Sequence, residues 1–170
     1  MQARAKQEYV DYVTARLPSL RKLAFLLCGD EHRADDLVQQ TITKLYVRWQ
    51  RTSAMEHLDQ YVRTMLVRTF VDEKRRPWSR VGLVAEVPDA PMPGDDRVEN
   101  WMVLRKALAR TPRRQQAVLV LRFLYDQSVE DVARALNCSE GTVKSQTSRG
   151  LATLRRMLDG NELIAAQRRR

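Results

Sequence analysis

The stretch from Tyr125 to Arg156 contains the residues best suited to contact DNA. Its pattern predicts two short helices joined by a tight turn at Asn137 and Cys138. The second helix is expected to begin after Ser139, a favourable N-cap residue, and to run to about Leu158. This arrangement is typical of a helix-turn-helix, which lays its second helix in the major groove of DNA.

One face of this second helix combines small, hydroxylated and basic side chains. Small side chains allow a helix to approach the groove closely, and cationic side chains reach phosphates or guanine edges. The residues expected on this face are Gly141, Thr142, Lys144, Ser145, Ser148, Arg149 and Arg156. The opposite face, expected to pack against the rest of the protein, has Val143, Gly150, Leu151 and Leu154. The alternative is an ordinary helical hairpin whose basic face is only solvated.

A second basic face lies on the helix expected from about Leu58 to Arg76. Its cations are Arg63, Lys74, Arg75 and Arg76, with Arg68 at the edge. Aromatic rings able to stack an unpaired base lie nearby, at Tyr61, Phe70 and Trp78. Because Tyr61 falls on the apolar stripe of the helix, the simpler interpretation is that these rings belong to the core. A basic helix face is weak evidence alone, since many are merely solvated.

The helix expected from about Arg33 to Gln50 has an outer face poor in Lys and Glu. Such a face predicts a docking surface for another protein, because ordinary surface helices carry more charge. The face comprises Asp36, Gln39, Gln40, Thr43, Val47 and Gln50. The candidate contacts with a protein partner are these residues apart from Gln50, together with Asp35. The alternative for Asp35 and Asp36 is that they stabilise the positive end of the helix dipole. A carboxylate metal site at Asp30, Glu31, Asp35 and Asp36 is disfavoured, because no histidine or further acid is expected to converge on it.

These surfaces need a helical framework, and the composition favours helix, with only 6 Gly and 6 Pro in 170 residues. Helical spacing predicts a helix around residues 9–13, a new helix that begins at Pro18, and a turn at Gly29 and Asp30. Helical spacing returns near Val98. A further helix begins at Thr111-Pro112 and is expected to bury Ala117, Val118, Leu121 and Phe123.

We therefore expect an all-α protein made of two small helical domains joined by an extended linker. The linker has four of the six prolines, and the segment 77–100 has five acidic against two basic residues. The expected divisions are a first domain over 1–76, the linker over 77–97, a second domain over 98–160 and a basic tail over 161–170.

The overall charge and the rare residue types narrow the possible functions. The net charge of +9 favours a polyanionic partner, although part of it can serve solubility alone. Cys28 and Cys138 lack neighbouring metal ligands and are expected to be small buried groups, so no metal or cofactor is predicted. No apolar run reaches the ~18 residues of a membrane span, and no signal-peptide pattern begins the chain. We expect a cytoplasmic, nucleoid-associated protein without membrane insertion.

Three segments, in this order, resemble the extracytoplasmic-function (group IV) sigma factors of bacterial RNA polymerase, and especially the short actinobacterial SigE-type group. The segment similar to sigma regions 2.1–2.2 is LLCGDEHRADDLVQQTITKLYVRW. The segment similar to regions 2.3–2.4 is LDQYVRTMLVRTFVDEKRR, and that similar to region 4.2 is SVEDVARALNCSEGTVKSQTSRGLATLR. One departure is Arg68, which stands where many members carry an Asn near the −10 base pocket.

The resemblance implies a protein that is not an enzyme and that directs core RNA polymerase to promoter DNA. Asp36 and Gln40 would contact the clamp helices of the largest subunit, together with Asp35, Gln39, Thr43 and Val47. The −10 element would be read by Arg63, Arg68, Lys74, Arg75 and Arg76. The −35 element would be read by Gly141, Thr142, Lys144, Ser145, Ser148 and Arg149. The flap of the second subunit and an anti-sigma factor are the further expected partners.

Two other functions are weighed against this one. A stand-alone helix-turn-helix regulator would need a ligand pocket or receiver domain within residues 1–76, and a helical body with a basic last helix suits sensing poorly. A small helical nuclease would need clustered metal ligands, whereas His32 and His57 are the only histidines in the chain.

Overall fold

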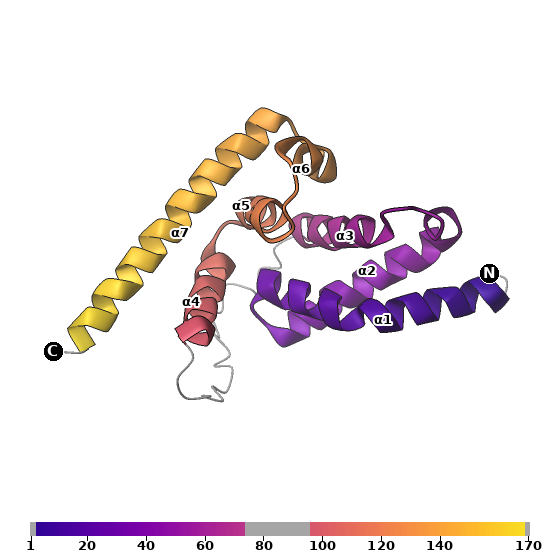
Figure 1. Cartoon of the computed structure of the whole chain (residues 1–170), viewed down its shortest axis with the longest axis horizontal. Coiled ribbons are helices and arrows are strands. Elements are labelled where there is room, and N and C mark those ends of the chain that lie inside the picture. Colours follow the sequence, from indigo (N-terminus) through magenta and orange to yellow (C-terminus); the bar gives the residue numbers. More distant parts are fainter. Residues whose placement is uncertain (1–2, 74–95, 169–170) are drawn as a thin grey trace.

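The computed structural model describes residues 3–73 and 96–168, with side chains for 3–73 and 101–160. Every regular element within these residues is a helix, as predicted (Figure 1). The elements in chain order are α1 (Ala3–Cys28), α2 (Glu31–Thr52), α3 (Leu58–Asp72), α4 (Asp96–Arg110), α5 (Arg113–Leu119), the π-helical turn η2 (Val120–Leu124), α6 (Val129–Leu136) and α7 (Glu140–Arg168).

Helices α1, α2 and α3 form the N-terminal group. The predicted turn between α1 and α2 is confirmed: Gly29 has a φ of +69°, a conformation that glycine adopts without steric cost. Asp30 then caps α2, because its carboxylate accepts a hydrogen bond from the backbone N–H of Arg33 at 2.8 Å. The inner side of α2 buries Leu37, Leu45 and Trp49 in the core.

Helix α1 runs unbroken through Pro18, so the prediction of a new helix beginning there was wrong. An interior proline costs a helix about 3 kcal/mol, because it removes one backbone hydrogen bond and crowds the preceding turn. Tertiary contacts on both sides of the proline offset this cost. Before it, the Tyr9 hydroxyl donates to the carbonyl of Ile42 at 2.8 Å. After it, Leu20 and Leu27 are buried in the core.

Helix α3 ends at Asp72, four residues before the predicted end at Arg76, because Glu73 leaves the helical conformation with a ψ of 112°. The guanidinium of Arg113 occupies the helix end, donating to the carbonyls of Phe70 and Glu73 at 2.8 Å each. The expected DNA contacts Lys74, Arg75 and Arg76, together with the aromatic Trp78 and most of the predicted linker, lie outside the described residues.

Helices α4 to α7 form the C-terminal group, and two apolar residues there differ from prediction. Phe123 is 60% exposed, because the wider π-helical turn carries it out of the face that buries Val118 and Leu121. Leu151 is 42% exposed, although Val143 and Gly150 on the same helix are buried as predicted. Helix α7 also continues to Arg168, through most of the segment expected to be a separate tail.

The two groups pack directly against each other, which the sequence did not predict. Buried residues of the first group, such as Leu27 and Phe70, belong to the same apolar core as Val118 and Leu121 of the second. Figure 1 shows α5 and α6 lying against the end of α3 and α4 lying against α1. The relative position of the two groups therefore decides which faces of the molecule are open.

Candidate nucleic-acid interface

Helices α6 and α7 form the predicted helix-turn-helix, and local hydrogen bonds define both its helix ends. Ser128 caps α6 through a 3.0 Å hydrogen bond from the backbone N–H of Asp131. Asn137 ends α6 in the left-handed conformation, with a φ of +50°. The hydroxyl of Ser139 then accepts from the backbone N–H of Thr142 at 3.1 Å, as expected for the N-cap of α7.

The DNA-facing side predicted for α7 is open to solvent at most of its positions. Gly141, Lys144, Ser145, Ser148 and Arg149 are exposed, whereas Thr142 is half-buried. Within this part of the chain, the hydroxyl of Thr142 bonds that of Ser139 at 2.9 Å, and the hydroxyl of Ser145 donates to the carbonyl of Thr142 at 3.0 Å. Lys144 and Arg149 therefore provide the charge that reaches outward from this face.

The docking face predicted on α2 is also exposed, and its composition is as expected. Asp36, Gln39, Gln40 and Thr43 are exposed, and the side chain of Val47 is 79% exposed. Asp35 differs, because its carboxylate turns toward α1 and accepts two hydrogen bonds of 2.8 Å from the guanidinium of Arg21. Asp35 thus holds α2 to α1, which leaves the other five residues as the outward face.

The two described arginines of the basic α3 face both reach toward the C-terminal group. Arg68 donates to the backbone carbonyls of Arg134, at 2.8 Å, and Ala135, in the last turn of α6. The guanidinium of Arg63 lies over the ring of Tyr125, 4.8 Å from its centroid. Cations beside the end of a helix and above an aromatic ring are both favourable electrostatic arrangements.

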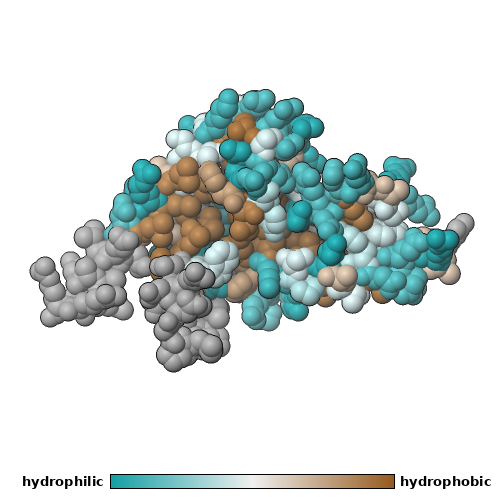
Figure 2. All heavy atoms as spheres, in the orientation of Figure 1, coloured by the Kyte–Doolittle hydropathy of each residue, from teal (hydrophilic) through white to brown (hydrophobic). Residues whose placement is uncertain are grey.

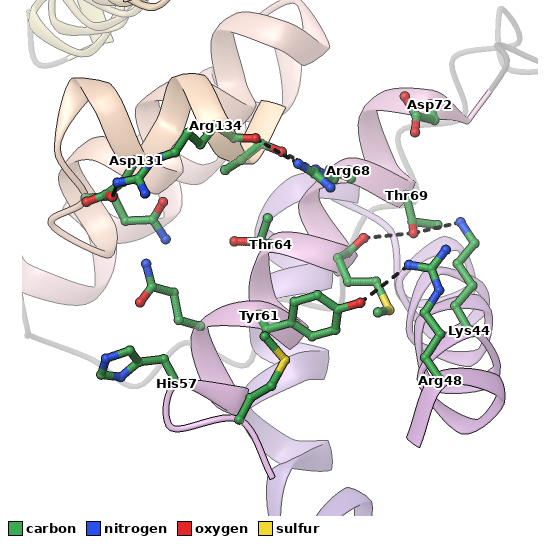
Figure 3. A pocket seen from close by; sticks show the side chains of 15 residues that line it. Lys44, Arg48, His57, Tyr61, Thr64, Arg68, Thr69, Asp72, Asp131 and Arg134 are labelled. Carbon is green, nitrogen blue, oxygen red and sulfur yellow. Dashed lines mark hydrogen bonds and ion pairs between the residues drawn. The ribbon is translucent and has the colours of Figure 1, made fainter. Parts of the chain in front are cut away.

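Between α3 and α6 lies a cleft of about 600 Å³ (Figure 3). Its N-terminal wall carries Lys44, Arg48, Tyr61 and Arg68, and the α6 wall carries Asp131 and Arg134. Most of these cations have local partners. Arg48 donates to the Tyr61 hydroxyl at 3.4 Å and Lys44 to the Thr69 hydroxyl at 3.0 Å. The cleft is thus lined by basic residues of α2 and α3 on one wall and by α6 of the helix-turn-helix on the other.

Cross-group hydrogen bonds cap three helix ends, which otherwise have unpaired carbonyls. Arg68 caps α6 as described, and Arg113 of α5 caps α3 while pairing with the Glu73 carboxylate at 2.9 Å. The side-chain amide of Gln116 donates to the carbonyl of Leu27 at the end of α1, at 2.9 Å. Gln116 is only 1% exposed. The sequence predicted none of these hydrogen bonds. Nothing in the residues around Arg68, Arg113 or Gln116 indicates which distant helix end each side chain contacts.

The pKa values of Asp59 and Cys28, in the N-terminal group, are both shifted. Burial alone would raise the pKa of Asp59, but hydrogen bonds from Arg16, at 2.9 Å, and Tyr12, at 2.8 Å, hold it below its ordinary value. Burial raises the pKa of the Cys28 thiol to about 11, which disfavours its reactive thiolate form. Cys28 and Cys138 are both half-buried, rather than buried as predicted. Among the residues that the structure describes, His, Cys, Asp and Glu side chains form no group that could hold a metal ion.

An apolar surface lies where α4, η2 and α7 meet, and periodicity did not reveal it. Trp101, Phe123, Leu124 and Leu151 are exposed there around a groove of about 220 Å³. Figure 2 shows hydrophobic residues gathered at this place on an otherwise mostly hydrophilic face. Exposed apolar surface of this kind marks a protein-binding site more often than a DNA-binding one. The described helices include no segment with the length and apolar character needed to cross a membrane.

Comparison with known protein families matches both helical groups to regions of sigma-70 factors. The family model for sigma-70 region 2 matches residues 12–80, and that for sigma-70 region 4 matches residues 101–154. The RNA polymerase sigma-E factors of Streptomyces avermitilis and Streptomyces coelicolor are each 34% identical over 93% of this chain, covering 89% and 90% of their own lengths. The ECF sigma factor EcfG of Rhodopseudomonas palustris is 31% identical over 89% of this chain and 87% of its own.

A solved structure shows the same fold. The sigma factor RpoE of Bartonella quintana, determined in complex with the anti-sigma factor NepR, superposes with a TM-score of 0.66 at 24% sequence identity. The match covers 90% of this chain and 98% of that one.

Proposed function

This chain belongs to the extracytoplasmic-function sigma factors of the sigma-70 family, which direct RNA polymerase to promoters, and we propose which of its surfaces carries each step. The observation that carries the proposal is that separate exposed faces, on α2 and on α7, suit a protein partner and a DNA partner respectively. A stand-alone regulator is not favoured, because the N-terminal helices match sigma region 2 rather than a sensing domain.

The −35 element is assigned to α7. Lys144 and Arg149 supply cations for phosphates or guanine edges, while Gly141, Ser145 and Ser148 let the helix approach the groove. Each neutralised phosphate contributes about −0.9 to the slope of log affinity against log salt. This anchoring holds the duplex while the polymerase opens the DNA downstream. Thr142 is half-buried and serves chiefly to start the helix.

The −10 element is assigned to α3 and the residues that follow it, with Arg63 and Arg68 as its described cations. Capturing an extruded base costs a few kcal/mol of unstacking, and stacking contacts return about 1–3 kcal/mol per base. Because the margin is small, strand separation should need the core enzyme and −35 anchoring together. The free protein is therefore expected to bind promoter DNA weakly.

Two surfaces are assigned to the polymerase. The outward face of α2, with Asp36 and Gln40 at its centre, is proposed to dock on the clamp helices of the largest subunit. The apolar groove around Phe123 and Leu151 is proposed to receive the flap of the second subunit, because its exposed side chains need an apolar partner. Docking at both places fixes the two helical groups relative to the enzyme.

An anti-sigma factor is the further partner that we propose. The support is that the outward face of α2 is mostly uncharged beyond Asp36 and partly apolar, and includes the highly exposed Val47. The similar sigma factor of Bartonella quintana was solved with such an inhibitor. A protein that covers α2 would compete directly with the core enzyme. Because the partners proposed for these surfaces are RNA polymerase and promoter DNA, we propose that the protein acts inside the cell.

Run-off transcription with core enzyme tests these assignments. The double variant Lys144→Ala/Arg149→Ala should lose initiation that depends on the −35 element while still binding core enzyme in pull-down. Lys106→Ala/Arg155→Ala removes the same charge from exposed positions outside the DNA face predicted on α7, and is expected to initiate more strongly than the first variant. Equal activity of the first variant and the wild type would overturn the assignment of α7.

A further inference from the structure

The start of α7 carries an acidic residue among the basic and hydroxylated side chains of the DNA face. Glu140 is the first residue of α7 and the only acid between residues 140 and 158. Its side chain is 56% exposed, and Figure 1 shows this end of α7 at the edge of the molecule, beside α6. In a helix-turn-helix, the first residues of the second helix meet the edges of the bases. Glu140 is therefore placed to meet DNA at the first turn of this helix.

The carboxylate of Glu140 is open to a ligand. Its Oε2 atom lies 4.0 Å from Nζ of Lys144, one turn further along α7, which is too long for a hydrogen bond. The N-cap of the helix is Ser139, whose hydroxyl accepts from the backbone N–H of Thr142 at 3.1 Å. The next residue, Gly141, has no side chain that could shield Glu140. Glu140 and Lys144 thus extend to the same side of α7 with their charged groups in solvent.

An anion at this position is unfavourable for binding DNA in general, because the phosphates that attract the cations of α7 repel a carboxylate. In the major groove, only a base that presents a hydrogen-bond donor compensates for this repulsion, since a carboxylate can only accept. The donors there are the N4 amino group of cytosine and the N6 amino group of adenine. Adenine presents the N7 acceptor beside its N6, and this acceptor repels a carboxylate. Cytosine is therefore the better partner for Glu140.

We propose that Glu140 selects cytosine at one position of the −35 element by accepting a hydrogen bond from its N4 amino group. The inference rests on the proposed assignment of the −35 element to α7. Lys144, on the same side of the helix, then contacts a phosphate or a guanine edge next to that cytosine. Because Glu140 also lowers the affinity for other bases at this position, it contributes to specificity by repulsion as well as by attraction.

A carboxylate in the first turn of a helix also stabilises that helix, through the helix dipole and through an ion pair with a cation four residues later. Glu130 provides a matched comparison for this role. It lies in the first turn of α6, its side chain is 71% exposed, and it stands 3.9 Å from Arg134, four residues later. Glu130→Gln therefore removes the same charge and the same kind of ion pair from the helix that does not enter the groove. A change in base preference confined to variants of Glu140 separates base reading from helix stabilisation.

The test is run-off transcription by core enzyme reconstituted with the full chain, on a promoter that the wild type uses, with each −35 base pair changed in turn. The wild type and Glu130→Gln should favour cytosine at one position by about fivefold to 100-fold over the other bases. Glu140→Ala should reduce that preference to less than about twofold. Glu140→Gln should move the preference at the same position to adenine, because an amide donates to N7 and accepts from N6 of adenine.

If both Glu140 variants keep the wild-type preference at every −35 position, the inference is overturned. It is also overturned if Glu130→Gln changes the preference as much as Glu140→Gln does. The variant Lys144→Ala/Arg149→Ala, measured on the same templates, keeps two failures apart. Wild-type initiation by this variant would contradict the assignment of α7 itself, and the inference with it. Lost initiation by this variant, together with unchanged base preferences of the Glu140 variants, would contradict only the role of Glu140.

Discussion

The side-chain amide of Gln116 in α5 donates to the carbonyl of Leu27 at the end of α1, at 2.9 Å, with a longer contact of 3.3 Å to the carbonyl of Leu26. The residues are 89 positions apart in the sequence and belong to different helical groups. Because Gln116 is only 1% exposed, water cannot replace this bond in the packed form. The pairing ties the position of the helix-turn-helix to the end of α1.

Gln116→Glu should destabilise the packed form strongly. The new carboxylate cannot donate to the two carbonyls it faces, so an unpaired buried charge results, at a cost of about 3 kcal/mol. The measurement is urea unfolding followed by circular dichroism. Gln50→Glu, at an exposed position of α2, should change the free energy of unfolding by less than about 0.5 kcal/mol. Equal losses in the two variants would show that Gln116 is not a buried link.

Two glycines of α7 should respond in opposite ways to alanine. A Cβ on Gly150 would lie 2.9 Å from Cδ1 and 3.1 Å from Cγ of Leu119, which is itself buried and cannot turn aside. Overpacking of this kind costs about 1–3 kcal/mol, more than the roughly 1 kcal/mol that alanine adds to helix stability. Gly160→Ala meets no atom within 4 Å and should stabilise. Urea midpoints at constant m-value test the signs, and stabilisation by Gly150→Ala would contradict the packing.

The hydrogen-bonded carboxylate of Asp59 should make stability depend on acid pH. Its pKa in the folded protein lies below the ordinary 3.8, so its contribution is present above that value and is lost as the pH falls through the folded pKa. Asp59→Asn should therefore be less stable than wild type near pH 7, with the gap closing below about pH 4. The gap should stay under about 1 kcal/mol, because solvent screens this exposed pair. A gap that widens in acid would refute the account.

Asp36→Arg should abolish binding to core enzyme and leave the fold intact. Asp36 is exposed on the outward face of α2 and makes no cross-helix contact like that of Asp35. Loss of a negative charge near the start of the helix should cost only about 0.5–1 kcal/mol. Pull-down with core enzyme gives the readout, with Asp11→Arg on exposed α1 as the control. Retained binding of core enzyme by Asp36→Arg would show that the polymerase contacts another face of the protein.

The sequence predicted many of the helix ends and turns, because helix caps and apolar spacing depend on residues that are close together in the chain. The turn at Gly29, the cap at Ser139 and the left-handed end of α6 at Asn137 all follow from side chains beside them. The break expected at Pro18 failed, because contacts from α2 and the core outweigh the proline's cost. The early end of α3 depends on Arg113, forty residues beyond Glu73, and no local signal contains it.

The faces predicted on α2 and α7 are mostly exposed, but the surroundings of the arginines on α3 were not foreseeable. Whether Arg63 and Arg68 are free depends on where α6 lies, and that depends on long-range contacts such as that of Gln116. Phe123 and Leu124 of the groove lie in a π-helical turn, which shifts the helical spacing and has no clear signal in the sequence.

The most direct measurement of the central claim is reconstitution of the purified chain with sigma-free core RNA polymerase on a promoter library from its own genome. The account predicts transcripts that begin at defined start sites, and loss of those transcripts with Asp36→Arg but not with Asp11→Arg. Failure of the wild-type chain to confer any specific start site on an active core enzyme would contradict it.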